Sequence, residues 1–351
     1  MKKLSSVTRR SFLSNTRGHG RALIWLSAVN FGLLIALYII ESRTAERHWL
    51  GTLITYAPQH FYCLPSLILL AWAGFRKNGR AMAINLAALA FFGTALLGFC
   101  VPWRAEIDGL GGPHAQRKHI RVMTYNIHHS QNGGILVADE IRKAKPDVVF
   151  LQEANALLDW SSAVSEFLHS DPSWRLIDYG ELAILSRYPI KEHAISQMEW
   201  TTGRIIVKAV LDVEGRSVTV IDVHLNSSLR SGLTDFRGVS LADRLNAASR
   251  TRLVQLDALL NVTRRIPGPL IVAGDFNTPP RGELYRRMSA RLTDAFGYAG
   301  WGVGYTFRSD VPAMRIDYVF LGNGVRAERC WAPHTQVSDH LPLVADVELP
   351  R

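Results

Sequence analysis

Polar residues that can do hydrolytic chemistry stand directly after short apolar runs in the C-terminal two-thirds of this chain. They are Asn126, Glu153, His224, Asp275 and Asn277. Carboxylate and amide oxygens can hold a hard cation such as Mg²⁺, and an imidazole can move a proton. Because an α/β scaffold places its ligands where strands end, this recurrence predicts one shared site. The chemistry that suits the set is metal-assisted attack of water on phosphorus.

Other catalytic chemistries find less support in the sequence. No serine or cysteine stands in a nucleophile-elbow context, so a covalent intermediate is not indicated. The three cysteines, Cys63, Cys100 and Cys330, allow neither a disulfide framework nor zinc-ligand spacing in the C-terminal part. Glu153 has no Lys or Arg beside it in the sequence, which leaves a cation as its natural partner.

Short β-branched runs alternate with helical patterns from Ile120 onward, which indicates an α/β domain over residues 117–351. Helices are expected at 135–144 and from about Leu241 to Leu260. Strands are expected at 120–125, 147–151, 182–185, 204–213, 217–224, 270–273, 316–321 and 343–347.

Seven motifs occur in a fixed order along this domain. They are Met-Thr-Tyr-Asn126, Leu-Gln-Glu153, Leu-Ser-Arg187-Tyr-Pro-Ile, Asp-Val-His224-Leu, Gly-Asp275-Phe-Asn277, Arg-Ile-Asp317-Tyr-Val-Phe and Ser-Asp339-His340. The set resembles the endonuclease/exonuclease/phosphatase superfamily, which has the DNase I-like fold. The resemblance implies a four-layer α/β sandwich, in which helices cover two central sheets and the site lies at the mouth between the sheets.

The resemblance also implies a role for each motif residue. His340 would be the general acid or base at the phosphate, oriented by Asp317. The full catalytic set would be His224, Asp275, Asn277, Asp317 and His340. The ligands of Mg²⁺, or alternatively Mn²⁺, would be Asn126, Glu153 and Asp339.

Supporting roles extend to residues around these motifs. Glu181 lies where some family members place a carboxylate behind the histidine that corresponds to His224. Thr306 and Arg308 precede the Asp317 strand, where family members often place substrate-contacting residues. Three further histidines are expected to be ordinary structural residues: His128, His129 and His334.

The charge distribution bears on the substrate. The formal charge of +10 divides into 12 Lys and Arg against 4 Asp and Glu in residues 1–111, and 28 against 26 in residues 112–351. A domain near neutrality gives little support to a nuclease, which needs a broad basic face. The arginine-rich stretch 227–252, with Arg230 and Arg237, could instead form a wall for a phosphorylated headgroup.

Three functions therefore stay open on the sequence. The chain could be a nuclease, a phosphodiesterase or phosphatase of phospholipid headgroups, or a membrane-anchored protein that binds phosphate ligands at a degenerate site. The third is disfavoured because no core catalytic position that can be matched is replaced. No protein partner can be inferred.

The first third of the chain carries three apolar stretches that approach or reach membrane-spanning length. They cover about 22–40, 53–75 and 81–101, within a membrane region 1–101. Pro58 and Pro65 interrupt the second stretch, which is alternatively a re-entrant or interfacial segment. Residues 102–116, rich in glycine, are expected to be a linker.

Basic residues predict the orientation of these stretches. They precede the first stretch and separate the second from the third at Arg76, Lys77 and Arg80, so both places belong in the cytoplasm. With three spans, the domain lies on the other side, in the periplasm or outside the cell. Arg9-Arg10 resembles a twin-arginine export signal, or is simply part of a basic leader.

Overall fold

The fold is described from a computed structural model, which covers residues 5–109, 118–155, 167–168, 171–227 and 238–350 and, for side chains, begins at Gly20. The chain divides into two compact units. One consists of Met1–Ser42 with Ala57–Phe99, and the other of Arg43–Tyr56 with Cys100–Arg351.

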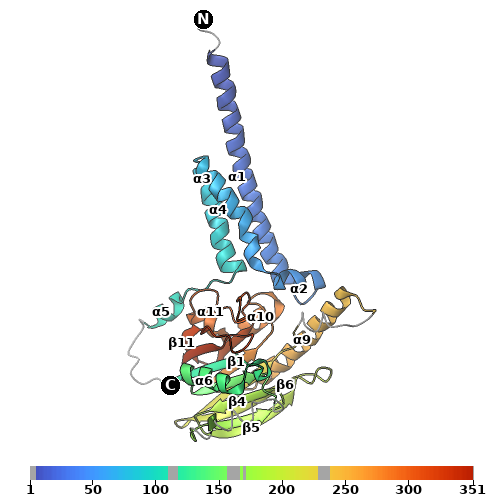
Figure 1. The fold of residues 1–351 in the computed structure, drawn as a ribbon, viewed down its shortest axis with the longest axis vertical. Helices are drawn as coiled ribbons and strands as arrows, with labels where there is room; N and C mark the ends of the chain where they lie inside the picture. Colours follow the sequence, from blue (N-terminus) through green and yellow to red (C-terminus); the bar gives the residue numbers. More distant parts are fainter. Residues whose placement is uncertain (1–4, 110–117, 156–166, 169–170, 228–237, 351) are drawn as a thin grey trace. The chain divides into compact units, whose positions relative to one another are not determined.

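The first unit is helical (Figure 1). Its elements are α1 (Ser5–Thr44, whose last two residues belong to the other unit), η1 (Gln59–Cys63), α3 (Leu64–Phe75), α4 (Gly79–Phe91) and the π-helical turn η2 (Phe92–Leu96). Asn78 Nδ2, in the turn between α3 and α4, donates to Gly20 O at 3.0 Å. At the other end Gln59 Nε2 donates to Glu41 Oε1 at 2.9 Å. Therefore α3 runs antiparallel to α1, and α4 runs parallel to it.

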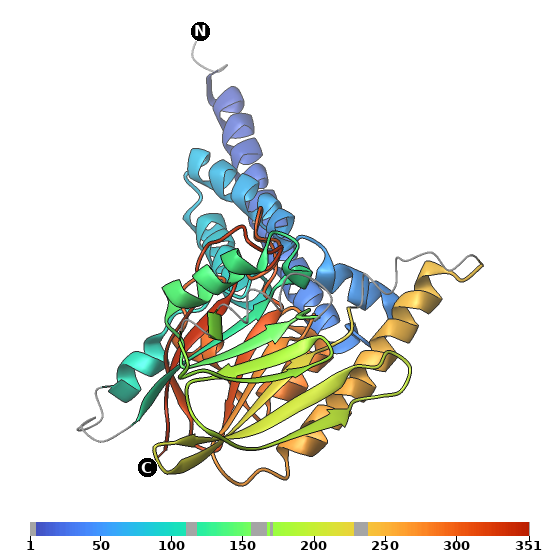
Figure 2. The same ribbon diagram turned by 60° about the horizontal axis from the view of Figure 1, so that its bottom comes forward.

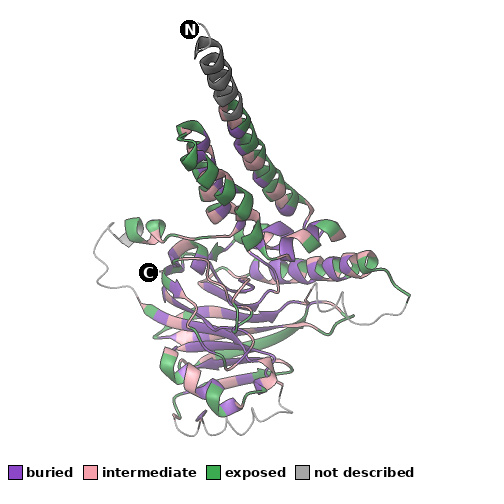
Figure 3. Cartoon of the chain, turned by 45° about the horizontal axis from the view of Figure 1, so that its top comes forward, coloured by how far each residue is buried: buried purple, intermediate pink, exposed green. Residues whose placement is uncertain are grey.

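Two stretches of this unit are long and apolar enough to cross a membrane among the residues described, namely Gly20–Thr44 and Gly79–Leu96. Only 22% and 28% of their most apolar windows are buried, unlike the core helix of a soluble protein. Figure 3 shows exposed residues in green along these helices. Inside the unit, polar side chains pair with one another, as when Asn85 Nδ2 donates to Ser27 Oγ at 2.7 Å.

The expected second and third apolar segments need correction. Residues 53–75 do not form one helix, because the first of them complete α2 (Trp49–Tyr56), which belongs to the other unit. The third segment ends earlier than 101, since Cys100 exchanges backbone hydrogen bonds of 2.7 and 3.0 Å with Gly302. Nor is 102–116 simply a linker: α5 (Trp103–Gly109) packs against α11 (Ala295–Ala299) and β11 (Arg326–Trp331).

The second unit is built on two six-stranded sheets (Figures 1 and 2). The first has the order β11-β12-β1-β2-β4-β3, and the second β5-β6-β7-β8-β10-β9. The strands of the first sheet, besides β11, are β1 (His119–Asn126), β2 (Val148–Gln152), β3 (Arg175–Tyr179), β4 (Leu182–Ser186) and β12 (Leu343–Glu348). Those of the second are β5 (Ile190–Gln197), β6 (Ile205–Val213), β7 (Arg216–His224), β8 (Leu270–Asp275), β9 (Thr293–Asp294) and β10 (Asp317–Gly322).

Alternating side chains explain why the two sheets pack face to face. Residues of one face of each sheet, such as Val122 and Phe150 on the first and Val220 and Ile271 on the second, form one buried cluster between them. The opposite face of the first sheet packs with α6 (Gly134–Ala144). The opposite face of the second packs with the helices α9 (Leu241–Thr263) and α10 (Gly282–Ser289). The expected four-layer sandwich is confirmed.

A polar bridge crosses this apolar interface. Gln152 on β2 accepts a hydrogen bond from Thr124 Oγ1 at 3.2 Å and donates to Asp222 Oδ1 on β7 at 2.7 Å. All three side chains are fully buried. Burial raises the pKa of Asp222 well above its usual range, against the smaller opposing effect of the Gln152 hydrogen bond. Burial therefore favours the neutral carboxylic acid form of Asp222 in the folded chain.

Asp222→Asn tests this assignment. The folded wild-type chain keeps a proton that the unfolded chain releases near pH 4, so wild-type stability falls as pH rises above that value, by at most about 1.4 kcal/mol per pH unit. Asparagine removes this dependence. We measure the melting temperature of the full-length chain in detergent. The value for the variant minus the value for wild type should be larger at pH 8 than at pH 5. Asp139→Asn, on the exposed face of α6, is the control, and an equal pH dependence of variant and wild type would contradict the assignment.

Candidate active site

The strand pairing brings the predicted residues together at one end of the sandwich. Parallel pairing of β1 with β2 aligns Asn126 with Gln152, next to Glu153. Parallel pairing of β7 with β8 aligns His224 with Asp275. Since β10 runs antiparallel to β8, its first residue, Asp317, also lies opposite Asp275. Residues scattered over almost 200 positions of sequence therefore meet because their strands end at the same edge.

Asp275 lies at the centre of this group and is 1% exposed. Its Oδ2 accepts from Asn126 Nδ2 at 3.0 Å and lies 3.5 Å from His224 Nε2 and 3.8 Å from His340 Nε2. Its Oδ1 accepts from the backbone N–H of Asn277 at 2.8 Å. The Asn277 side chain donates in turn to Leu225 O at 3.0 Å, which ties the loop after β8 to the loop after β7.

His340 forms a buried pair with Asp317, with Nδ1 and Oδ2 2.9 Å apart. Burial alone would lower the pKa of His340, but the charges of Asp317 and Asp275 outweigh it and raise the pKa to about 10. The metal-free imidazole is therefore protonated at neutral pH, and its Nε2–H points toward Asp275. Thr306 fixes Asp317 from behind, since its Oγ1 accepts from the backbone N–H of Asp317 at 3.2 Å.

His224 is held by two residues on its other side. Arg204 Nη1 lies 2.8 Å from His224 Nδ1, and Glu181 Oε2 lies 3.4 Å from the same nitrogen. Glu181 also pairs with Arg204. Burial would raise the pKa of Glu181, but His224 and Arg204 together lower it to about 2. Since Arg204 and Glu181 both approach Nδ1, Nε2 is the nitrogen that faces Asp275.

Oxygen ligands for a hard cation lie on the first-sheet side. Glu153 is 7% exposed, and its Oε1 accepts from Asn126 Nδ2 at 3.3 Å. Its Oε2 lies 3.2 Å from His129 Nε2, while Asp339 Oδ1 lies 3.5 Å from His128 Nδ1. Carboxylate and amide oxygens of this kind suit Mg²⁺ or Mn²⁺. A second group, Asp275, Asp317 and His340, has ligand atoms within 4.8 Å of one another, and Nδ1 of its imidazole is engaged by Asp317.

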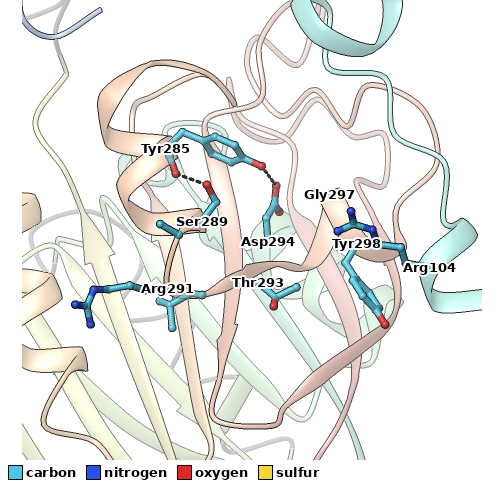
Figure 4. Close-up of a pocket in the computed structure, with 10 residues that line it drawn as sticks. Arg104, Tyr285, Ser289, Arg291, Thr293, Asp294, Gly297 and Tyr298 are labelled. Carbon is cyan, nitrogen blue, oxygen red and sulfur yellow. Dashed lines mark hydrogen bonds between the residues drawn. The ribbon is translucent and has the colours of Figure 1, made fainter. Parts of the chain in front are cut away.

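These residues open into a cavity of about 350 Å³. Its walls are formed by Tyr56, Glu153, Arg204, His224, Ser227, Asp275, Asn277, Phe307, Met314, Ile316, Asp339 and His340. A separate hollow of about 410 Å³ shares none of these lining residues (Figure 4). In it, Tyr285 donates to Asp294 at 2.9 Å and Ser289 donates to Tyr285 O at 2.8 Å, so its polar groups serve the fold.

The structure gives a different result for each of the residues that were predicted to bind substrate. Arg230 and Arg237 lie outside the described residues. Thr306 is fully buried and supports Asp317, so the prediction that it contacts substrate is corrected to a positioning role. Arg308 is exposed and pairs with Asp310 at 2.9 Å. Phe307, the residue between Thr306 and Arg308, lines the cavity.

Several residues in or beside the site were not predicted. His128 and His129, expected to be structural, lie beside the carboxylates of Asp339 and Glu153, and their position just after the Asn126 motif was a usable signal. Arg204 directly precedes β6 and belongs to none of the motifs. Tyr56 comes from the apolar first third of the chain, where nothing in the sequence points to the site.

Comparison with known proteins agrees with this geometry. The sequence model of the Endonuclease/Exonuclease/phosphatase family matches residues 123–340, which is more than half of the chain. The chain belongs to this family. Members of the family are phosphoester hydrolases, as the name states, and the matched range includes every motif residue described above.

Individual relatives are more distant. The UPF0294 protein VV2535 of Vibrio vulnificus (strain YJ016) is 34% identical over 101 residues, which are 27% of this chain and 33% of that protein. The chain thus matches about a third of the length of this curated relative. Among solved structures, an endonuclease/exonuclease/phosphatase family protein from Bacteroides thetaiotaomicron has a TM-score of 0.53 at 16% identity, covering 67% of this chain and all of that one.

A second solved structure shares the fold. The Bacteroides thetaiotaomicron mannosyl-6-phosphatase Bt3783 has a TM-score of 0.50 at 16% identity, covering 65% of this chain and 99% of that one. Likeness at this identity establishes the fold alone.

Asp317→Asn tests the pairing that raises the pKa of His340. Removing the negative charge 2.9 Å from Nδ1 should lower that pKa by about 1 to 3 pH units, the range that a nearby opposite charge produces. The measurement is an NMR titration of the metal-free, histidine-labelled chain. Asp310→Asn, an exposed carboxylate paired with Arg308, is the control, and an unchanged His340 titration in Asp317→Asn would contradict the pairing.

Proposed function

We propose that this chain is a membrane-anchored, divalent-metal-dependent hydrolase of phosphoester bonds. The observation that carries the proposal is the buried His340–Asp317 pair facing Asp275, with the Glu153 carboxylate, which accepts from Asn126 Nδ2, in the lining of the same cavity. A proton donor, a buried carboxylate and a set of hard-cation ligands are the parts that hydrolysis at phosphorus needs.

The ligand set fits a divalent cation held by Glu153 and Asn126, with Asp339 contributing. Five carboxylates, those of Glu153, Glu181, Asp275, Asp317 and Asp339, gather around a cavity in which Arg204 is the fixed positive charge among the described lining residues. A cation would neutralise this excess of negative charge and, when bound, would polarise a phosphoryl oxygen.

The chain's own residues supply the remaining steps. Asp275, buried and held by Asn126 and the Asn277 backbone, accepts the proton of the attacking water. His224 donates from Nε2 to a phosphoryl oxygen, since Arg204 occupies Nδ1. His340, protonated because of Asp317 and Asp275, donates from Nε2 as negative charge develops on the phosphate.

The cavity favours a single phosphorylated headgroup over a long nucleic acid. Its volume of about 350 Å³ is at the lower end for small-molecule sites. Tyr56, Phe307, Met314 and Ile316 give one wall an apolar character that suits the carbon skeleton of a headgroup or the acyl end of a lipid. A nuclease would use a run of cations along a groove, for which the near-neutral charge of residues 112–351 gives little support.

Membrane anchorage rests on the first unit. Its exposed faces carry large apolar side chains, including Trp25, Leu33, Ile68, Phe75 and Leu86, which are 55–85% exposed. The turn between α3 and α4, with Arg76, Lys77 and Arg80, lies beside Gly20 and Arg21. Basic residues at one end of the bundle favour a cytoplasmic location for that end. The chain leaves the bundle at the opposite end, after Ser42 and after Phe99, so the catalytic unit is periplasmic or extracellular.

Hydrolysis is tested with the full-length chain in detergent and Mg²⁺, offered phospholipid vesicles, plasmid DNA, RNA and a chromogenic phosphodiester in parallel. We expect release of headgroup or of its phosphate, stopped by EDTA and restored by Mg²⁺ or Mn²⁺. His340→Ala should lower turnover by about 10²- to 10⁴-fold, the usual contribution of a positioned acid.

His193→Ala, in the exposed strand β5, is the matched control and should keep wild-type turnover. Nicking of plasmid DNA without headgroup release would replace the substrate class by nucleic acid. Full turnover in EDTA, or in His340→Ala, would contradict the mechanism.

The orientation is tested separately. A reporter enzyme that works only outside the cytoplasm, fused after Arg351, should be active, because three passes place the catalytic unit opposite the basic end of the bundle. The same reporter fused within the Arg76–Arg80 turn should be inactive. The reverse pattern would put the catalytic unit in the cytoplasm.

A further inference from the structure

A short segment from the N-terminal third is part of the catalytic unit. Residues Arg43–Tyr56, between the first apolar helix and η1, belong to the same compact unit as residues 100–351. The segment packs on α9 through α2, and Thr52 Oγ1 lies 3.3 Å from Ser249 Oγ in a buried contact. Arg281 Nη2 donates to Thr55 O at 2.8 Å. The contacts are polar, specific and closed to solvent.

Glu46 anchors the start of this segment and is 2% exposed. Its Oε2 accepts from the backbone N–H of Glu283 at 2.8 Å, and its Oε1 lies 3.3 Å from Thr278 Oγ1 and 3.9 Å from Arg252 Nη1. The fit is close: a Cβ on Gly282, which has φ +82°, would lie 2.7 Å from Glu46 Oε2. This glycine lets the backbone of the catalytic unit approach the Glu46 carboxylate.

Arg252 connects the segment to the catalytic loop. It projects from α9, is fully buried, and donates from Nη1 to the Tyr56 hydroxyl at 2.5 Å. Its Nη2 donates to Asn277 O at 2.8 Å and to Phe276 O at 3.2 Å. Tyr56 itself donates to Asn277 O at 2.7 Å. The Asn277 carbonyl therefore accepts from both side chains at once.

Asn277 needs such support because of its backbone. Its φ is +49°, in the left-handed region that costs a residue with a Cβ about 1 kcal/mol or more. Its backbone N–H also donates to Asp275 Oδ1 at 2.8 Å, so its conformation sets the orientation of the carboxylate at the centre of the site. Tyr56 lines the cavity beside both residues.

We propose that Tyr56 is a positioning residue of the active site. Together with Arg252 it fixes the backbone carbonyl of Asn277, and through that loop it orients Asp275 and Asn277 toward the substrate. The inference rests on the proposed hydrolase function and deepens it, since it makes the segment that follows the first apolar helix a working part of the catalytic machinery.

Tyr56→Phe in the full-length chain removes the hydroxyl and keeps the ring. We expect kcat to fall about 3- to 10-fold, the effect of losing one ordinary hydrogen bond, while KM for the chromogenic phosphodiester stays within about twofold. Tyr188→Phe, a half-buried tyrosine outside the cavity lining, is the matched control and should keep both constants. Unchanged kcat in Tyr56→Phe would overturn the proposal.

A double variant separates positioning from general stabilisation. If Tyr56 acts through the loop that orients the Asp275 carboxylate, then Tyr56→Phe combined with Asp275→Asn should be no slower than Asp275→Asn alone. A role independent of that loop would make the two losses multiply, which would also overturn the proposal.

A third measurement does not depend on turnover, so a failure of the hydrolase proposal can be told apart from a failure of this one. Hydrogen–deuterium exchange should quicken at the amides of Phe276 and Asn277 in Tyr56→Phe, relative to wild type and Tyr188→Phe. Equal exchange would refute the positioning role, even in a chain that hydrolyses nothing. Faster exchange in an inactive chain would support the positioning role and contradict only the hydrolase proposal.

Discussion

The site is organised around a carboxylate that is taken out of water. Asp275 is 1% exposed, and a buried charge must be matched by donors or by a cation. Its donors come from both sheets. Asn126 belongs to the first sheet, and the Asn277 backbone lies in the loop after β8 of the second. His224 and His340 complete the shell at 3.5 and 3.8 Å. Because these groups converge on one carboxylate, the two sheets must meet in a fixed register, and the strand ends that carry the candidate site residues are held within reach of one another.

This arrangement depends on a rigid interface below the site. The sheets pack through an apolar cluster, and the Gln152–Asp222 hydrogen bond of 2.7 Å joins β2 to β7 inside it. A neutral Asp222 can be buried there at much lower cost than an ionised one. Gln152 immediately precedes Glu153, and Asp222 lies two residues before His224. The bridge therefore fixes the relative positions of Glu153 and His224 on opposite sheets.

The sequence predicted the interior of the fold better than its margins. All eight expected strands are present. Each lies in the interior of a sheet and pairs on both sides, so its apolar pattern is strong. The four strands that were not expected, β3, β5, β9 and β11, are the four edges. An edge strand is bonded on one side only and tolerates polar residues; seven of the eight residues of β5 are exposed. Asn126, His224 and Asp275 end interior strands, so the sequence pattern could place them at one sheet edge, whereas Arg204 and Tyr56 reach the cavity only through tertiary packing.

The boundary of the catalytic unit shows why composition misleads at the start of the chain. Hydropathy assigns residues 53–56 to an apolar segment, but α2 ends there with Tyr56 bonded to Asn277. Arg252, fully buried on α9, loses the hydroxyl of Tyr56 and the carboxylate of Glu46 in any chain that starts after residue 56. Water would replace these two partners, while the bonds from Arg252 to Phe276 O and Asn277 O would remain. The catalytic unit is thus defined by the pairing of its buried charges, and it begins before the third apolar segment.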